Sequence, residues 1–337
     1  MKFKQFKKLA EQYKTIPVYR RVLADLLTPI SVFMKLAKTS DYAFILESVE
    51  GGEQYSRYSF IGCDPKQIIK SENDKVYIKS NGFWESIEVD FLSYLRTIHK
   101  SYQTPKLDYI PNFTGGLVGY LGYESIVWVE DIPVYDNDML INTPDAIFML
   151  FEELIAFDHL KNQIILFSNV KIDLNKNIKD SFDAALEKID IMGERLHQDI
   201  DFQTVKVKGG LPTESNFSES KFKEAILLAQ DHIKSGDIFQ LVLSQRFKRK
   251  TTVSPYAIYR ALRTINPSPY MFHLKLSDFE VIGASPELLV KVENNNIQIR
   301  PIAGTRKRGN TSKEDVKLAD ELLNDEKELA EHLMLVD

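Results

Sequence analysis

Short runs that alternate hydrophobic and polar residues recur along the chain, a pattern typical of strands with one buried face. Turn residues interrupt several of these runs, for example Ser80–Asn81–Gly82 and Ser277–Asp278. The pattern predicts three hairpins, with strands at residues 76–78 and 85–89, 270–276 and 279–284, and 288–293 and 297–301. Consecutive hairpins indicate mostly antiparallel sheets.

Helical periodicity occupies other segments. Apolar residues spaced three or four apart predict helices at the N-terminus around Phe6, over residues 91–102 and 180–196, and from Phe222 to Ile233. Ser218 or Ser220 can cap this last helix, and Gly236 can close it. Further strands are expected within residues 41–61, at 146–157 and 163–170, and at 238–247. The fold class is therefore α+β, with helices packed on sheets.

The domain organisation follows from where periodicity is lost. Residues 200–217 lack a regular pattern and contain Gly209–Gly210 and Pro212, so we interpret them as a linker. This divides the chain into residues 1–199, mainly strands, and residues 218–337. Four glycines between Gly115 and Gly122 precede no amphipathic helix, so close backbone packing in a sheet is expected there rather than a dinucleotide site.

Composition restricts the functional classes. The 337 residues are 44% hydrophobic and 27% charged, with a formal net charge of -5. This is an ordinary globular mixture, and its charge gives no attraction to nucleic acid. No apolar run is long enough to span a membrane. The single cysteine, Cys63, excludes an intrachain disulfide and fits a cytoplasmic protein.

Two glutamates near the C-terminus are candidate metal ligands. Glu328 and Glu331 are three residues apart, so on a helix they share a face, with His332 beside them. Two carboxylates on one face can hold magnesium directly or through water. Taken alone, the spacing fits a solvated helix face better, with Lys327 and Glu331 as an ordinary i,i+4 pair.

Other polar residues lie at strand ends or within strands. Glu287 follows Gly283–Ala284–Ser285–Pro286, where a fixed carboxyl can act as a general acid, although a solvent-facing turn acid is equally consistent. Gly304–Thr305 offers backbone N–H groups and a hydroxyl to an anion. Gln240 lies within a predicted strand and needs hydrogen-bond partners, which is also consistent with a structural role.

Several whole segments resemble one family. They are Asp237 to Arg246, Asn266 to Met271, Gly283 to Glu287, Arg300 to Thr305 and Asp325 to Asp337, preceded by Ile45 to Ser48, Arg57 to Ser59 and Gly115 to Tyr120. Together they are similar to the chorismate-binding enzymes, specifically the large-subunit family of the anthranilate synthases. The resemblance covers nearly the entire chain and implies that family's α+β fold.

The resemblance also implies roles for individual residues. Gly304 and Thr305 would contact chorismate. Glu331 would be a magnesium ligand supported by Glu328, and magnesium would anchor the ring carboxylate. Glu287 would protonate the departing C4 hydroxyl while ammonia attacks C2, and loss of pyruvate would then give anthranilate. These groups are expected to converge with Gln240 on one cleft.

Two positions bear on the choice among related reactions. Relatives that add water at C2 carry a lysine base where this chain has Gln240, and neutral ammonia needs no such base. Aminodeoxychorismate synthases often carry a lysine nucleophile where this chain has Ala303. Both residues favour the anthranilate reaction, and aminodeoxychorismate synthase remains the alternative enzyme.

A second ligand site is implied by two further segments. Ile45 to Ser48 and Pro269–Tyr270–Met271 resemble the family's tryptophan feedback site. Ser48 would bond the polar end of tryptophan, and Tyr270 and Met271 would pack on its indole. For Tyr270 and Met271 alone, strand core is the simpler interpretation. A non-catalytic tryptophan-binding remnant is therefore the second alternative.

The family pattern is expected to continue past Asp337 with further catalytic residues and strands that complete the second region. On this expectation the C-terminal part of the fold is missing, and the polypeptide by itself is inactive. Its ammonia would come from a glutamine amidotransferase partner, because no glutaminase cysteine pattern occurs in the sequence.

Overall fold

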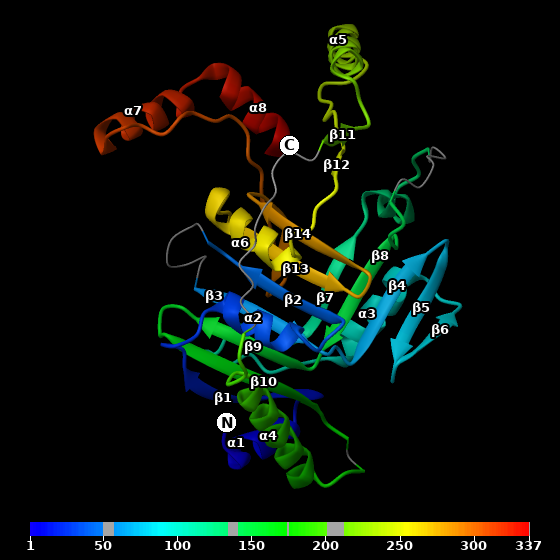
Figure 1. Cartoon of the computed structure of the whole chain (residues 1–337), viewed down its shortest axis with the longest axis vertical. Coiled ribbons are helices and arrows are strands. Elements are labelled where there is room, and N and C mark those ends of the chain that lie inside the picture. Colours follow the sequence, from blue (N-terminus) through cyan, green and yellow to red (C-terminus); the bar gives the residue numbers. More distant parts are fainter. Residues whose placement is uncertain (50–56, 134–140, 174, 201–211, 337) are drawn as a thin grey trace. The chain divides into compact units, whose positions relative to one another are not determined.

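The structure, a computed structural model, describes residues 1–49, 57–133, 141–173, 175–200 and 212–336 (Figure 1). It divides into two compact units, Met1–Asp201 with Tyr259–Asp337, and Phe202–Ile258. Most of the predicted linker, residues 201–211, lies outside the described residues, and the proposed division at residues 200–217 stays a prediction. Among the described residues no helix has the length and apolar character needed to cross a bilayer.

A seven-stranded antiparallel sheet forms the centre of the first unit. Its order is β1-β10-β9-β3-β2-β13-β14. The strands are β1 (Thr15–Leu23), β10 (Gln163–Lys171), β9 (Glu153–Asp158), β3 (Tyr58–Cys63), β2 (Tyr42–Glu47), β13 (Tyr270–Leu276) and β14 (Phe279–Ser285). Strand β13 pairs with β2 across more than 200 residues of sequence, with Met271 opposite Glu47. The sheet therefore joins the N-terminal half of the chain to residues beyond 258.

A second, five-stranded sheet packs against the first. Its order is β6-β5-β4-β8-β7, and all neighbouring strands are antiparallel. The strands are β6 (Phe83–Ile87), β5 (Lys75–Ser80), β4 (Gln67–Glu72), β8 (Ala146–Phe151) and β7 (Gly116–Leu121). Strand β7 carries Gly119, where a Cβ would collide with the backbone of Ile147 and Phe148 in β8. The expected close backbone packing of the glycine segment is thus confirmed at Gly119.

The two sheets and their helices form layers (Figure 1). Helices α1 (Phe3–Ala10), α2 (Pro29–Ala37) and α4 (Ile178–Arg195) cover the outer face of the seven-stranded sheet. Between the sheets lies one core cluster that includes Phe44, Met149, Phe151 and Phe167. Helix α3 (Phe91–Ser101) packs on the far face of the five-stranded sheet. Buried apolar residues on both faces of each sheet hold the layers together.

The chain passes directly from one sheet to the other at Glu152. Residues 146–157, predicted as one strand, are two strands, because β8 ends at Phe151 and β9 begins at Glu153. Lys66 Nζ lies 2.5 Å from the Glu152 carboxylate, and Tyr102 donates to it at 2.8 Å. These partners compensate a nearly buried carboxylate at the crossing, which allows a polar residue inside an apolar run.

The three predicted hairpins are confirmed as β5–β6, β13–β14 and β15 (Leu288–Glu293) with β16 (Asn296–Arg300). Asn81 and Gly82 both adopt positive φ in the first of them, which is why a short Asn-Gly turn suits it. Helices α6 (Pro255–Ile265), α7 (Ser312–Leu323) and α8 (Glu326–Val336) and the 3-10 helix η1 (Tyr123–Trp128) complete the elements of this part of the chain. Helices α2, α6 and α7 were not predicted.

The second unit contains helix α5 (Glu219–Ser235) and a two-stranded ladder of β11 (Thr213–Ser215) with β12 (Phe247–Arg249). Ser218 caps α5 by accepting from the Lys221 amide, and Gly236 closes it with φ 78°, as predicted. The prediction of a strand over residues 238–247 is wrong, since strand geometry begins at Phe247. Among the described residues no strand forms a ladder with residues 238–246, although the Asn216 amide donates to the Arg246 carbonyl at 3.2 Å, so alternation alone does not make a strand.

Candidate functional site

Gly304 and Glu328, 24 positions apart, meet in one small hollow. The hollow has a volume of about 190 Å³ and is lined by Ala303, Gly304, Leu322, Leu323, Glu328, Leu329 and His332. Gly304 follows strand β16, and Glu328 lies in the first turn of α8. The Glu328 carboxylate lies so close to Gly304 that a Cβ at this position would overlap its Oε2. The hollow thus combines a loop backbone with a carboxylate.

The first turn of α8 is ordered by its own capping residue. Asp325 Oδ1 accepts hydrogen bonds from the backbone amides of Lys327 and Glu328, both at 3.1 Å. The amide of Glu328 lowers the pKa of Asp325, and the Arg306 guanidinium acts in the same direction. Arg306 also donates to the carboxylate of Glu328. The start of α8 is therefore anionic, with one arginine already bound to it.

The other predicted ligand-binding residues of this region are exposed to solvent. Thr305 is exposed beside the hollow, and Glu331 is exposed one turn further along α8. Among the described residues no group of three or more His, Cys, Asp and Glu side chains is arranged to hold a metal ion. Glu328 and Glu331 are thus two carboxylates without a third protein ligand in the described part of the chain.

Two further predicted catalytic residues, Glu287 and Gln240, lie in irregular segments. Glu287 is exposed in the connection between β14 and β15, where the Ser285 hydroxyl donates to its carbonyl at 3.2 Å. Gln240 is exposed in the second unit, in a segment that does not form the predicted strand. Because Gln240 belongs to a different unit from Glu287, Gly304 and Glu328, the convergence of these residues on one cleft stays a prediction.

The four predicted tryptophan-site residues do lie together. Ser48, Pro269, Tyr270 and Met271 line a pocket of about 250 Å³, whose other walls are Leu46, Glu47, Tyr58, Phe60 and Phe272. The pairing of β2 with β13 brings the two segments together. The pocket has a mainly apolar lining with a few polar groups, which is the usual character of a small-molecule site.

Sequence reasoning missed a buried polar network that includes Glu47, one of the residues lining this pocket. Tyr259 donates a 2.7 Å hydrogen bond to Glu47, and Arg263 Nε lies 3.3 Å from the same carboxylate. Burial raises the pKa of Glu47, and the two partners oppose that rise. Both partners belong to α6 and are four residues apart, and this spacing, which puts them on one face of a helix, is the signal that was available.

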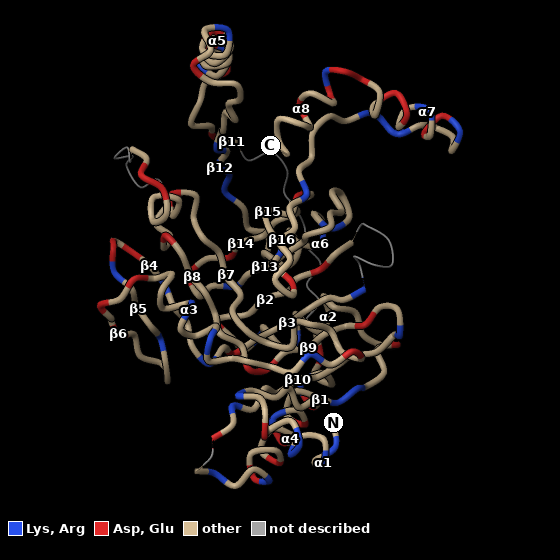
Figure 2. Tube along the Cα trace, turned by 180° about the vertical axis from the view of Figure 1, so that it is seen from behind, with Lys and Arg blue, Asp and Glu red and all other residues tan. Residues whose placement is uncertain are grey.

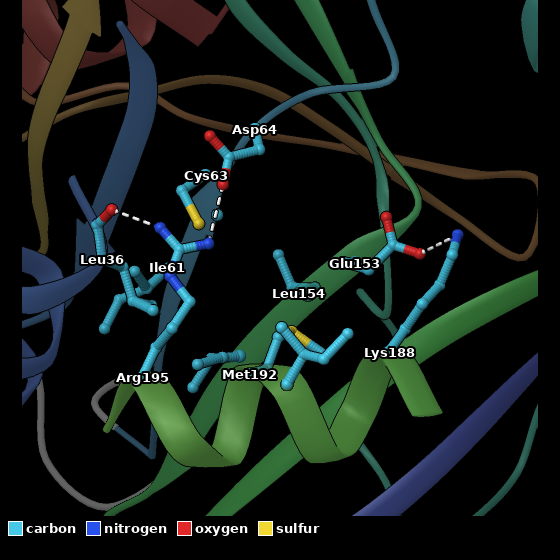
Figure 3. Close-up of a pocket in the computed structure, with 12 residues that line it drawn as sticks. Leu36, Ile61, Cys63, Asp64, Glu153, Leu154, Lys188, Met192 and Arg195 are labelled. Atoms are coloured by element: carbon cyan, nitrogen blue, oxygen red, sulfur yellow. Dashed lines mark hydrogen bonds and ion pairs between the residues drawn. The ribbon is translucent and has the colours of Figure 1, made fainter. Parts of the chain in front are cut away.

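A further hollow of about 190 Å³ lies between α4, α2 and the seven-stranded sheet. Figure 3 shows Arg195 at one end, bound to Asp64 and to the Leu36 carbonyl, and Lys188 with Glu153 at the other. Burial raises the pKa of the Cys63 thiol, which lies beside Arg195, to about 12. None of the predicted site residues lines this hollow.

Charge is mixed rather than gathered near the candidate site. Figure 2 shows Lys and Arg interspersed with Asp and Glu along α7 and α8. Arg308 pairs with Asp315, and Lys317 with Glu321, so positive and negative groups there offset one another. This region therefore does not form the continuous basic surface that a nucleic-acid backbone requires.

Comparison with known proteins identifies the family. The family model described as chorismate binding enzyme matches residues 41–337. Anthranilate synthase component 1 of Acetivibrio thermocellus is 42% identical, over 99% of this chain and 68% of its own length. The protein of that name from Neisseria meningitidis serogroup B is 39% identical, over 97% of this chain and 67% of its own length. The chain spans about two thirds of the length of these relatives.

Solved structures agree with the sequence relatives. The crystal structure of anthranilate synthase component I from Streptococcus pneumoniae TIGR4 matches with a TM-score of 0.71 and 33% identity, over 94% of this chain and 67% of that chain. The menaquinone-specific isochorismate synthase MenF of Escherichia coli matches with a TM-score of 0.53 and 13% identity, which shows a shared fold alone. The chain belongs to the chorismate-binding enzyme family and, within it, to the anthranilate synthase component 1 group.

Proposed function

We propose that this chain carries the chorismate site of an anthranilate synthase, which converts chorismate and ammonia to anthranilate and pyruvate. The observation that supports this best is the contact of Gly304 with Glu328. The resemblance assigns these two residues to chorismate and to magnesium, and the fold brings them together from separate segments. A loop backbone beside a carboxylate suits an anionic ligand held through a divalent cation.

The chemistry of the donors fits magnesium. Glu328 and Glu331 offer hard carboxylate oxygens from one helix, and Mg²⁺ in proteins is often bound by one or two carboxylates while it keeps several waters. One Glu328 oxygen accepts from Arg306 at 2.9 Å, and the other faces Gly304. When bound, the cation would supply charge neutralisation for the ring carboxylate of chorismate.

The chain's own residues then account for the amination. Thr305 and the Gly304 backbone orient the substrate. Ammonia forms a bond to C2 while the bond from C4 to its hydroxyl breaks, and Glu287 donates the proton with which that hydroxyl leaves as water. Elimination of the enolpyruvyl group as pyruvate, with loss of the C2 proton, gives the aromatic ring of anthranilate.

The nucleophile is proposed to be ammonia rather than water or a side chain. Gln240 is neutral and offers no base for activating water, and Ala303, which lines the hollow beside Gly304, has no nucleophilic atom. Both residues argue against the isochorismate and aminodeoxychorismate branches. The ammonia is proposed to come from a glutamine amidotransferase subunit, consistent with relatives that are named as component 1.

Tryptophan is proposed to bind the pocket of Ser48 and Tyr270. The pocket lies on β2 and β13, and Glu47, one of its lining residues, is hydrogen-bonded to Tyr259 of α6. Binding there would inhibit if it favoured one arrangement of these elements over another. The proposed feedback therefore has a defined pocket and a defined neighbouring helix.

Calorimetry on the full 337-residue chain tests the proposal. Chorismate is titrated into the protein with Mg²⁺ present and again with Mg²⁺ chelated, and tryptophan is titrated separately. Chorismate binding that requires Mg²⁺, together with tryptophan binding at a second site, is the expected result. Tryptophan binding without any chorismate binding would instead support a tryptophan-binding remnant.

A further inference from the structure

One guanidinium joins the loop after β16 to the start of α8. Arg306 Nη1 donates to Glu328 Oε1 at 2.9 Å, and Arg306 Nη2 donates to Asp325 Oδ2 at 2.8 Å. Nη1 also lies 3.0 Å from the Thr305 carbonyl oxygen. Because the guanidinium is planar and its donors form a rigid fork, the two carboxylates are fixed relative to each other and to the loop.

The two carboxylates that Arg306 binds, those of Asp325 and Glu328, have different roles. Asp325 caps α8 through Oδ1, so its Oδ2 bond to Arg306 attaches the backbone of the first helical turn to the loop. Glu328 is held through its side chain, with one oxygen on Arg306 and the other facing Gly304. Arg306 therefore contacts both the capping residue of the helix and the side chain of Glu328.

The absence of a side chain at residue 304 is part of the same arrangement. A Cβ there would overlap Glu328 Oε2 and would lie 3.1 Å from Glu328 Cβ. To accommodate it, Glu328 must rotate away from the loop, and this rotation breaks its bond to Arg306. The conformation of the Glu328 side chain therefore depends both on the missing side chain at Gly304 and on the bond from Arg306.

We propose that Arg306 is a positioning residue, which fastens the Gly304–Thr305 loop to the start of α8 and aims the free oxygen of Glu328 at that loop. The loop and the carboxylate then form one unit rather than two independent groups. That the loop receives an anionic substrate and the carboxylate a cation rests on the proposed function. The attachment of the loop to the start of α8 does not depend on that function, because it follows from the contacts of Arg306.

The test is a double-mutant cycle followed by hydrogen–deuterium exchange on the full chain. The variants are Arg306→Gln, Gly304→Ala and the two combined. Each single change is expected to raise exchange in residues 301–306 and 326–330 about three- to tenfold, because each releases the same Glu328 contact. The combined variant is expected to match Arg306→Gln, which also releases Asp325, because the Glu328 contact can be lost only once.

Two further variants make the result specific. Arg308→Gln removes the same charge two residues away, from a side chain that is 90% exposed and paired with Asp315, and it should leave both segments unchanged. Arg306→Lys keeps the charge but lacks the fork, so it should restore protection in part. Independent effects that multiply in the combined variant, or full restoration by lysine, would overturn the proposal.

The role in binding is measured separately. Mn²⁺, used in place of Mg²⁺, is titrated into the wild-type chain and into Glu328→Gln and followed by electron paramagnetic resonance. Loss of bound Mn²⁺ in Glu328→Gln supports the proposed cation site, and unchanged binding contradicts it. Neither result alters the exchange cycle, so a failure of the proposed function is distinguishable from a failure of the positioning role.

Discussion

The Tyr259 hydroxyl donates a 2.7 Å hydrogen bond to the Glu47 carboxylate, 212 positions earlier in the chain. Glu47 is the last residue of β2 and lies opposite Met271 of β13. Its side chain is 1% exposed, so helix α6 supplies partners to a carboxylate that solvent hardly reaches. This contact links α6 to the two strands that form the Ser48–Tyr270 pocket.

Removing the Tyr259 hydroxyl is expected to destabilise the fold. Tyr259→Phe leaves the ring in place but takes a hydrogen bond from a buried carboxylate, which costs about 1–3 kcal/mol. Urea unfolding followed by circular dichroism measures the loss. The matched control is Tyr123→Phe, at a residue that is 91% exposed, and it should change stability by less than about 0.5 kcal/mol. Equal effects of the two substitutions would show that the contact contributes nothing.

Glu47 should also make stability depend on pH. Burial raises its pKa above 4.5, so the folded chain binds this proton more tightly than the unfolded chain. The resulting stabilisation is fully present below pH 4.5 and is lost as the pH rises through the raised pKa. Relative to Glu47→Gln, which does not titrate, the wild type should therefore lose stability as the pH rises above 4.5 and through the raised pKa, with both proteins measured by urea unfolding. A wild type that gains stability relative to Glu47→Gln as the pH rises would contradict the raised pKa.

Cys63 is expected to react slowly with thiol reagents. Burial raises its pKa to about 12, and the nucleophile is the thiolate. At pH 8 its thiolate fraction should be about a thousandfold lower than that of a free cysteine with a pKa near 8.5. The rate of reaction with a chromogenic disulfide measures this, with a denatured sample as the reference. Equal rates in the folded and denatured chain would rule out the shift.

The Ser48–Tyr270 pocket should bind tryptophan through a polar contact at Ser48. Ser48→Ala is expected to lower the affinity about fivefold, because one hydrogen bond contributes about 1 kcal/mol. Ser86→Ala, an exposed serine on β6 of the other sheet, is the control and should leave the affinity unchanged. Tryptophan that binds both variants equally well would place its site elsewhere.

Local chemistry in the sequence was enough to predict several elements. The Asn81–Gly82 turn adopts the left-handed backbone that its hairpin needs, and Ser218 and Gly236 mark the two ends of α5. These features depend on neighbouring residues alone. The pocket of Ser48 and Tyr270 was foreseen through the family resemblance, because no local pattern joins segments more than 200 residues apart.

What was missed depends on distant partners. The switch of sheets at Glu152 is stabilised by Lys66 and Tyr102, neither of which is near it in sequence. Residues 238–246 alternate like a strand, yet strands form only where a neighbour supplies hydrogen bonds. Arg306 was not singled out either, since its role depends on Asp325 and Glu328, about 20 positions later at the start of α8.

The central claim, that chorismate binds at the Gly304–Thr305 loop with the carboxylates of α8, is tested most directly by mapping the ligand. Hydrogen–deuterium exchange of the full chain is measured in Mg²⁺, with and without saturating chorismate. The account predicts slower exchange in residues 301–306 and in the first turn of α8. Bound chorismate that protects other segments and leaves both of these unchanged would contradict it.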